Sequence, residues 1–404
     1  MKYKWKKLDE IAEVTKLAGF EFTKYIDYVK DGKIIALRAL NIKNGELDLS
    51  NVKRISKEVS EKLPRSKVNK DEILLTYTGN SYGNCVIINE NDKYHLAPNV
   101  CKITPNKNLV EPYFLYCYIN SYGFRKQMEG NISGSAQPTI PMKAIRKLKV
   151  PMPDMNIQKN ISKNIKIIDE KIRNNKQIND NLISQLKIIS NSYFSYFEVY
   201  NGKIPLDWSY TKLVDIANID AGYSYTSKEL VDSNIAMATI KNFDRTGGFN
   251  IRGFKEIKPN KIVKKEKYAK LFDILVAHTD LTQNADIIGN AEPILNTSKY
   301  SKIIYSMDLV KVTPKAEKIS PFLLALLLQG DRFKKHCLGY VNGTTVLHLS
   351  KKALKEFEFP FPTSFSDLDN IAKFAERNYK LIANNMKENQ KLQNLKQVLL
   401  SKYF

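Results

Sequence analysis

Apolar residues recur in alternating steps of four and three between residues 161 and 196. This spacing predicts a long amphipathic helix, because a heptad repeat places its members along one seam of an α-helix. The members are Ile161, Ile165, Ile168, Ile172, Asn175, Asn179, Leu182, Leu186, Ile189, Tyr193 and Tyr196. At about 1.5 Å per residue, such a helix is about 50 Å long. Pro151 and Pro153 stand just before it, where an extended segment would stop.

The same seam returns between Leu368 and Phe404, with Asn385 and Asn389 at the places of Asn175 and Asn179. An Asn at a seam position costs stability but fixes the register and the partner of a helix. Its recurrence therefore predicts that the two helices pair with each other, antiparallel, so that the segments preceding them lie at opposite ends of a rod. Two helices that each lie on their own domain are the alternative.

Each helix follows a segment of roughly 150 residues whose pattern favours strands and short helices. Short β-branched runs broken by Gly, Asn and Pro predict strands at residues 33–38, 72–77, 83–88, 235–240 and 273–277. Residues 113–121 and 322–329 have the pattern of short helices. Short strings also repeat between the segments: Leu8-Asp9-Glu10-Ile11-Ala12 returns as Leu213-Val214-Asp215-Ile216-Ala217.

These patterns predict an α+β protein with two tandem mixed α/β domains, joined and separated by two long antiparallel coiled-coil helices. The expected domains span residues 1–153 and 207–362. The expected helices span residues 154–197 and 363–404, and residues 198–206 form the linker.

The chain has 404 residues and a net charge of +22, from 64 Lys and Arg against 42 Asp and Glu. This excess favours a polyanionic partner, nucleic acid before an anionic membrane. Much of it is Lys in a chain rich in Ile and Asn, as in proteins from AT-rich genomes, so part of the charge is background. The four cysteines have neither zinc spacing nor a disulfide framework, and no signal peptide or membrane span is evident, so we expect a cytoplasmic protein.

Motifs for the chemistry that often accompanies DNA binding are missing. The sequence has no Pro-Pro pair for an adenine methyltransferase loop, no GxGxxG turn and no GxxxxGK(S/T) loop. None of its four histidines has a metal-ligand spacing. We therefore expect a protein that is not an enzyme and needs no cofactor or metal. A self-contained methyltransferase with a cryptic site remains an alternative.

The order of segments, a body and then a long helix, twice, resembles the specificity (S) subunit of type I restriction–modification systems. Residues Ser133-Gly134-Ser135-Ala136-Gln137-Pro138-Thr139-Ile140 are similar to the Gly-Ser-x-Gln-Pro-x-Ile stretch that ends a target-recognition domain in that family. The second copy, residues 342–349, keeps the Gly and the hydroxyls but has Val346-Leu347 in place of Gln-Pro. The openings Trp5…Leu8…Ile11 and Trp208…Leu213…Ile216 are also similar to the family's domain start.

The resemblance covers essentially the whole chain and implies two target-recognition domains that read an asymmetric, bipartite site in double-stranded DNA. A spacer rod of about 50 Å would span about one and a half turns of duplex, at about 3.4 Å per base pair. The resemblance also implies two methyltransferase (M) subunits and two restriction (R) subunits as partners, which would supply adenine methylation and ATP-dependent cleavage. A tandem protein-interaction adaptor without sequence-specific DNA binding is the alternative.

Direct readout of bases needs polar side chains on exposed loops. Candidates in the first domain are Arg38, Asn41, Lys43, Tyr77, Thr78, Asn80, Ser81, Tyr82, Ser133, Ser135 and Gln137. Candidates in the second domain are Lys241, Asn242, Arg245, His278, Thr279, Thr282, Gln283, Asn284, Thr344 and Thr345. For each of them, an ordinary turn or a solvated surface position is the alternative.

Overall fold

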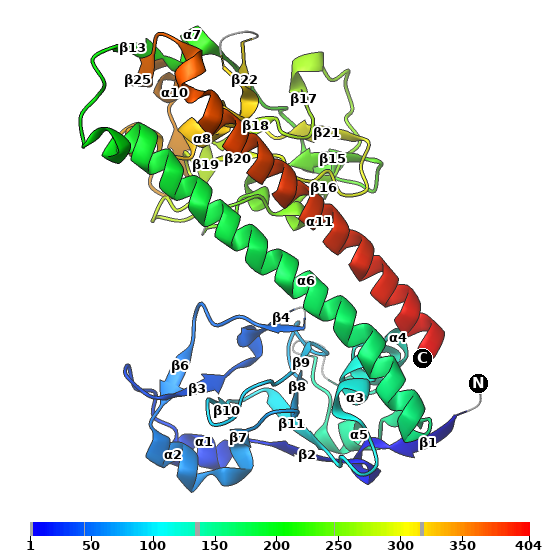
Figure 1. Cartoon of the computed structure of the whole chain (residues 1–404). Helices are drawn as coiled ribbons and strands as arrows, with labels where there is room; N and C mark the ends of the chain where they lie inside the picture. Colours follow the sequence, from blue (N-terminus) through cyan, green and yellow to red (C-terminus); the bar gives the residue numbers. More distant parts are fainter. Residues whose placement is uncertain (1–2, 44, 134–137, 246, 316–318) are drawn as a thin grey trace. The chain divides into compact units, whose positions relative to one another are not determined.

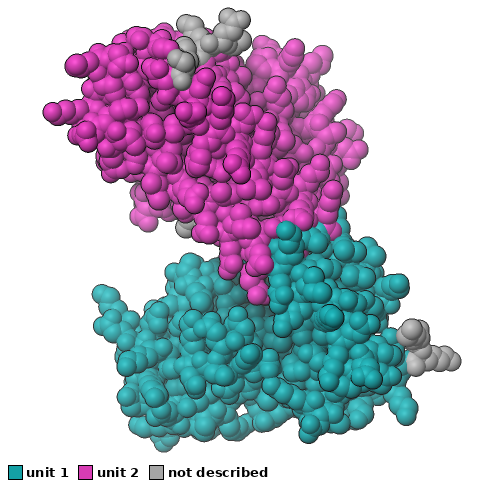
Figure 2. Space-filling model, in the orientation of Figure 1, with its two compact units in different colours: residues 1–171, 392–404 teal, residues 172–391 magenta. Residues whose placement is uncertain are grey.

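The computed structural model describes residues 3–43, 45–133, 138–245, 247–315 and 319–404. The chain forms two compact units, coloured separately in Figure 2. Unit 1 comprises residues 1–171 and 392–404, and unit 2 comprises residues 172–391. Each unit therefore contains one body and a stretch of both long helices.

Unit 1 is built on two four-stranded sheets. The first is antiparallel throughout and has the order β2 (Ala12–Lys16), β11 (Val100–Pro105), β8 (Ile73–Thr76), β9 (Cys85–Ile87). The second has the order β6 (Lys53–Ile55), β3 (Ile34–Leu37), β10 (Tyr94–Leu96), β7 (Lys67–Val68), and its central pair β3 and β10 is parallel. Two-stranded ladders join β1 (Lys4–Lys7) to β12 (Lys149–Met152), and β4 (Ile42–Lys43) to β5 (Glu46–Leu47).

Helices cover the sheets of unit 1 and complete its apolar core. They are α1 (Gly19–Tyr25), α2 (Lys57–Lys62), α3 (Pro112–Ile119), α4 (Tyr122–Glu129) and α5 (Met142–Lys147). Helix α3 begins where the sequence dictates: Pro112 takes the first position, and the Glu111 carboxylate accepts a 2.6 Å hydrogen bond from the Phe114 N–H. Its buried side chains pack with the inner face of β8 and β11.

Unit 2 repeats the two sheets strand for strand. One has the order β14 (Ala217–Ala221), β22 (Leu309–Pro314), β18 (Ile274–Ala277), β20 (Ala291–Pro293); the other has the order β16 (Lys255–Glu256), β15 (Ile235–Ala238), β21 (Lys302–Tyr305), β17 (Tyr268–Ala269). Strands β15 and β21 are parallel, as β3 and β10 are. Strand β13 (Trp208–Lys212) pairs with β25 (Glu358–Pro362), as β1 does with β12. The strands predicted from the sequence are confirmed as β3, β8, β9, β15 and β18.

The remaining elements of unit 2 also have counterparts. Its short helices are α7 (Leu213–Ile216), α8 (Pro321–Leu328), α9 (Asp331–Leu338) and α10 (Lys352–Glu356), and α8 confirms the helix predicted at residues 322–329, as α3 confirms the one at 113–121. A small third sheet joins β19 (Thr279–Asp280), β24 (Leu347–Leu349) and β23 (Val341–Asn342). In unit 1, isolated bridges of Thr139 with Thr78 and Ser133 stand at the same places.

The long helices are α6 (Met155–Ser190) and α11 (Asp369–Tyr403), drawn in Figure 1. In unit 2, the Asn175 Nδ2 donates to the Asn389 Oδ1 and the Asn385 Nδ2 donates to the Asn179 Oδ1, both at 2.9 Å. The partner numbers fall as the α6 numbers rise, so the helices are antiparallel. Because Asn175 corresponds to Asn385 and Asn179 to Asn389, the pairing is reciprocal, as in an interface with two-fold symmetry. The predicted antiparallel pairing is confirmed.

The same two helices meet in unit 1 through residues nearer the start of α6. Ile161 and Ile165 are buried in one core with Leu400 of α11. Beside them, the Lys396 ammonium lies 2.7 Å from the Asp169 carboxylate, which also accepts a 2.6 Å hydrogen bond from the Tyr113 hydroxyl. The apolar seam and a largely buried ion pair thus hold the end of α11 against the body of unit 1.

The predicted seam is wrong at its last member. Residues Asn191–Ser195 form a π-helical turn, which inserts one extra residue into the helical repeat. The insertion rotates the later side chains, so that Phe194 and Phe197 are 2% and 4% exposed, whereas Tyr196 is 43% exposed. The Tyr196 hydroxyl instead donates a 2.7 Å hydrogen bond to Asp331 of α9.

The buried Asn175–Asn389 pair makes a prediction about stability. Asn175→Leu leaves the Asn389 amide buried without this partner, so we expect the free energy of unfolding to fall by about 1–3 kcal/mol. The double variant N175L/N389L should recover most of this loss, because two apolar side chains face each other. Urea unfolding followed by circular dichroism measures both. Asn174→Leu, an exposed position on the same helix, is the matched control, and a double variant as unstable as the sum of the single ones would contradict the pairing.

Candidate nucleic-acid interface

Three candidate segments of unit 1 meet at one edge of its sheets. The loop after β3 and the loop after β8 are joined by a 3.2 Å hydrogen bond from the Asn84 Nδ2 to the Ile42 carbonyl. The loop after β8 also pairs with the segment that ends in Ile140, since Thr78 bridges Thr139 and the Ile140 N–H donates to the Tyr77 carbonyl at 2.9 Å. We call residues 38–51, 77–84 and 133–140, as far as the structure describes them, the loop edge of unit 1.

Unit 2 assembles its candidate segments in the same way. Strand β19 pairs with β24 through Thr279 and His348, and the Leu349 N–H donates to the His278 carbonyl at 2.8 Å. The Gln283 Nε2 donates to the carbonyls of Thr344 and Thr345. The loop after β15 is tied to strand β20 of the other sheet by a 2.8 Å hydrogen bond from the Gly248 N–H to the Glu292 carboxylate. Residues 239–253, 278–284 and 342–349, apart from Thr246, form the loop edge of unit 2.

The candidate residues differ in their exposure. Nine are exposed: Lys43, Asn80, Ser133, Lys241, Arg245, Gln283, Asn284, Thr344 and Thr345. Six are partly buried: Arg38, Thr78, Ser81, Tyr82, His278 and Thr282. Four are buried: Asn41, Tyr77, Asn242 and Thr279. Ser135 and Gln137 lie outside the described residues. All of them stay predictions, although the four buried residues present little of their side chains to solvent.

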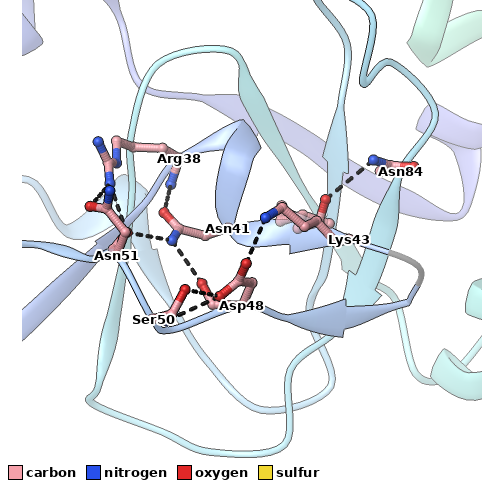
Figure 3. Close-up of polar contacts among 8 residues, drawn as sticks. Arg38, Asn41, Lys43, Asp48, Ser50, Asn51 and Asn84 are labelled. Atoms are coloured by element: carbon pink, nitrogen blue, oxygen red, sulfur yellow. Dashed lines mark hydrogen bonds and ion pairs between the residues drawn. The ribbon is translucent and has the colours of Figure 1, made fainter. Parts of the chain in front are cut away.

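Asn41 shows why a polar loop residue need not face solvent (Figure 3). Its side chain is 0% exposed, and its amide is hydrogen-bonded to the backbone of its own loop. The Oδ1 accepts from the Arg38 N–H at 3.1 Å, and the Nδ2 donates to the carbonyls of Asp48 at 2.8 Å and Asn51 at 2.9 Å. Both Nδ2 hydrogens are therefore engaged within the loop, and Asn242 is equally buried.

Burial also limits what Tyr77, Thr279 and His278 present to DNA. Tyr77 belongs to the apolar core of unit 1, and Thr279 is buried within strand β19. Burial, reinforced by the positive charge of Lys351, lowers the pKa of His278 to about 4. His278 is therefore neutral near pH 7 and supplies no positive charge to a phosphate.

The outer face of the loop edge of unit 1 carries paired polar groups (Figure 3). The Lys43 ammonium lies 2.6 Å from the Asp48 carboxylate, which also accepts a 3.1 Å hydrogen bond from the Ser50 N–H. The hydrogen bond from Lys43, followed by those from Ser50, holds the pKa of Asp48 below its usual range. The Arg38 guanidinium donates to the Asn51 carbonyl at 2.8 Å. Such solvent-facing pairs are worth little, so a DNA phosphate or base can replace them at small cost.

Sequence reasoning missed a cavity of about 300 Å³ beside the loop edge of unit 2. Lys187 of α6, Arg245 and Glu292 are among the residues that line it. Glu292 accepts hydrogen bonds from the Gly248 N–H and, at 3.0 Å, from the Gln329 Nε2, and burial raises its pKa to about 7. In the sequence, Glu292 stands out as an acidic residue within an apolar strand. Val86 is the corresponding residue of unit 1.

In residues 3–43, 45–133, 138–245, 247–315 and 319–404, no cluster of three or more His, Cys, Asp or Glu side chains could ligate a metal ion. In the same part of the chain, no helix has the length and apolar character that crossing a membrane requires.

A comparison with known proteins identifies the family to which this architecture belongs. A family profile described as "Type I restriction modification DNA specificity domain" matches residues 2–183 and again residues 205–394. The chain belongs to this family. Two matched stretches of similar length agree with the repeated body and helix found in the structure.

Individual relatives are distant. The chain is 27% identical over 183 residues to the EcoBI specificity subunit of Escherichia coli, which is 45% of this chain and 38% of that protein. It is 22% identical over 326 residues to the MjaVIII specificity subunit of Methanocaldococcus jannaschii, which is 73% of this chain and 69% of that protein. The crystal structure of the S subunit from M. genitalium shares the fold with a TM-score of 0.56 and 16% identity, covering 100% of this chain and 96% of that one.

Glu292 predicts a pH dependence of the stability of unit 2. The pKa of Glu292 is about 7 in the folded chain, against an ordinary value of 4.5 for a Glu side chain. Between these two pH values, the folded chain therefore holds a proton that the unfolded chain has released. Stability from this group is therefore present at pH 5 and lost as the pH rises to 8. Glu292→Gln cannot ionise, and at pH 8 it should be more stable than the parent by about 2–3 kcal/mol, with little difference at pH 5.

Thermal unfolding at both pH values measures this difference. The exposed Glu358→Gln is the matched control, and its effect should be the same at pH 5 and pH 8. A stability gain for E292Q that does not depend on pH would contradict the ionisation of Glu292.

Proposed function

We propose that this chain is the DNA sequence-recognition subunit of a type I restriction–modification complex and has no catalytic activity of its own. The observation that carries the proposal is that the family match occurs twice, once with each body and its helix. Each of the two units presents exposed polar side chains along one loop edge. Base-edge recognition by such side chains needs no catalytic group.

The two loop edges differ in chemistry, which supports an asymmetric bipartite site. Lys43 and Asp244 follow the same short helical turn in the two units and carry opposite charges. In unit 2, Gln283 donates to the carbonyls of Thr344 and Thr345, beside the Thr279–His348 pair that corresponds to the Thr78–Thr139 bridge of unit 1. Because different bases present different donors and acceptors, unequal loop edges suit unequal half-sites.

The domain organisation that fits this function follows the repeat. Residues 1–153 and 207–362 are the two target-recognition domains, and residues 198–206 are the linker. Residues 154–197 and 363–404 are the spacer helices, whose antiparallel pairing would fix the separation of the half-sites. The net charge of +22 supplies phosphate contacts that position both domains on the duplex.

Partner subunits would supply the chemistry. Two methyltransferase subunits, which modify adenine, and two restriction subunits, which cleave DNA with ATP, form the complex that this chain directs to its site. A cytoplasmic location follows from this role, because the host chromosome is the DNA to be modified.

Salt dependence tests DNA binding. A reader that neutralises six or more phosphates should lose affinity by roughly a thousandfold between 50 and 200 mM salt. Fluorescence anisotropy of a labelled duplex with the complex of this chain and its methyltransferase measures the slope, and the methyltransferase alone is the control. If adding this chain brings no salt-steep binding, the chain is a protein-interaction adaptor.

Domain exchange tests the modular reading. Replacing residues 1–153 by those of another family member should change one half-site of the methylated motif and leave the other unchanged. Methylation-sensitive sequencing of the host DNA reads both half-sites. As a control on the spacer, deletion of one heptad from both helices should shorten the gap and leave both half-sites intact. A simultaneous change of both half-sites after the exchange would contradict two independent domains.

A further inference from the structure

The buried asparagine of unit 1 has a counterpart of the same geometry in unit 2. Asn242 is 0% exposed, as Asn41 is. Its Oδ1 accepts from the Thr239 N–H at 2.9 Å, and its Nδ2 donates to the Asn250 carbonyl at 2.8 Å. Both residues end a short 3₁₀ turn that follows a central parallel strand, β3 in one unit and β15 in the other. We call residues 38–51 and 239–253, as described, the braced loops.

The two braced loops also share their backbone hydrogen bonds. The Asp48 N–H donates to the Asn41 carbonyl, and the Asn250 N–H donates to the Asn242 carbonyl, both at 2.8 Å. Two residues further on, the Ser50 N–H bonds the Asp48 side chain at 3.1 Å, and the Arg252 N–H bonds the Asn250 side chain at 3.0 Å. The frame of the loop is thus the same in two domains whose sequences have diverged.

The two braced loops differ in the side chains that they carry. Arg38 holds the far end of its loop through the Asn51 carbonyl, whereas Thr239 makes the matching bond to the Gly253 carbonyl. Asp48 in unit 1 is Asn250 in unit 2, so a carboxylate becomes an amide at one place. A constant frame with exchangeable donors and acceptors is what a reader of variable sequence needs.

Among the described residues, the side-chain hydrogen bonds of both asparagines stay inside their own loops. Those of Asn41 reach residues 38, 48 and 51, and those of Asn242 reach residues 239 and 250. Loss of the amide should therefore disturb the shape of one loop more than the sheets below it.

We propose that Asn41 and Asn242 are positioning residues for DNA readout, each of which sets the loop that reads one half-site without touching the DNA. The inference rests on the proposed function and adds the residues that fix the geometry of recognition. The inference predicts that the two asparagines act on different half-sites, because each braces only the loop of its own unit.

The test uses the full chain in complex with its methyltransferase. The methylated motif is first read by sequencing host DNA, and binding is then measured on the cognate duplex and on duplexes with one base changed in either half-site. Asn41→Ala should lower discrimination at one half-site by about tenfold and leave the other within about twofold, and Asn242→Ala should do the reverse. Asn41→Asp should behave like N41A, because a carboxylate cannot donate to the carbonyls of residues 48 and 51.

Asn106→Ala is the matched control in unit 1. Asn106 is exposed, and its Oδ1 accepts a hydrogen bond from the Asn108 N–H at 3.1 Å. It follows the end of β11, whose first residue, Val100, pairs with the last residue of β8, so it lies away from the loop edge. N106A should discriminate as the parent does at both half-sites.

The outcomes separate this inference from the proposed function. A parent complex that binds no sequence in preference to another overturns the proposed function. If the parent complex is specific, and N41A and N242A discriminate as well as the parent does, the inference alone is overturned. Loss at both half-sites together, or unfolding of N41A, N41D and N242A by circular dichroism, would show that the asparagines support the fold of the domain and would also overturn it.

Discussion

The packing of the long helices is the constraint on which the rest of the structure depends. The core of unit 1 contains Ile161 and Ile165 of its own helix but closes with Leu400 from the other half of the sequence. The core of unit 2 likewise includes Leu186 and Phe194 from the first half. Each body is thus completed by the helix that belongs to the other copy, so the two halves of the chain cannot reach their native cores independently. The reciprocal Asn pairs fix the register in which this exchange occurs.

An ion pair between largely buried groups recurs in both bodies. A largely buried carboxylate, Glu72 or Asp273, lies beside a buried lysine of the neighbouring strand, Lys102 at 3.1 Å or Lys311 at 3.9 Å. The residue before each carboxylate has a φ of 69°, although unit 1 has Asp71 there and unit 2 has Phe272, a bulky residue that disfavours this conformation. The turn geometry therefore dominates over local preference, which explains how one fold survives extensive divergence of sequence.

The sequence predicted those elements whose pattern is local and repeated. The heptads gave the seam through Ile189, and alternating short runs gave β3, β8 and β15, because periodicity reports directly which face a side chain occupies. It failed where direction depends on the tertiary surroundings. Asn41 and Asn80 are both polar loop residues, yet Asn41 is buried and Asn80 is exposed, and composition cannot distinguish them. The π-turn before Tyr196 and the buried Glu292 were missed for the same reason.

The buried and exposed polar groups of the loop edges divide the work of recognition between them. Groups that face solvent are engaged only by weak partners in the free protein: Lys43 with Asp48, and Gln283 with the carbonyls of residues 344 and 345. Exchange of such bonds for contacts with DNA costs little and can differ from one target to another. The amides of Asn41 and Asn242 are buried and hydrogen-bonded within their own loops, so exchanging their bonds for contacts with DNA would cost more. Under the proposed function, specificity would arise from replaceable surface groups held at positions that buried hydrogen bonds define.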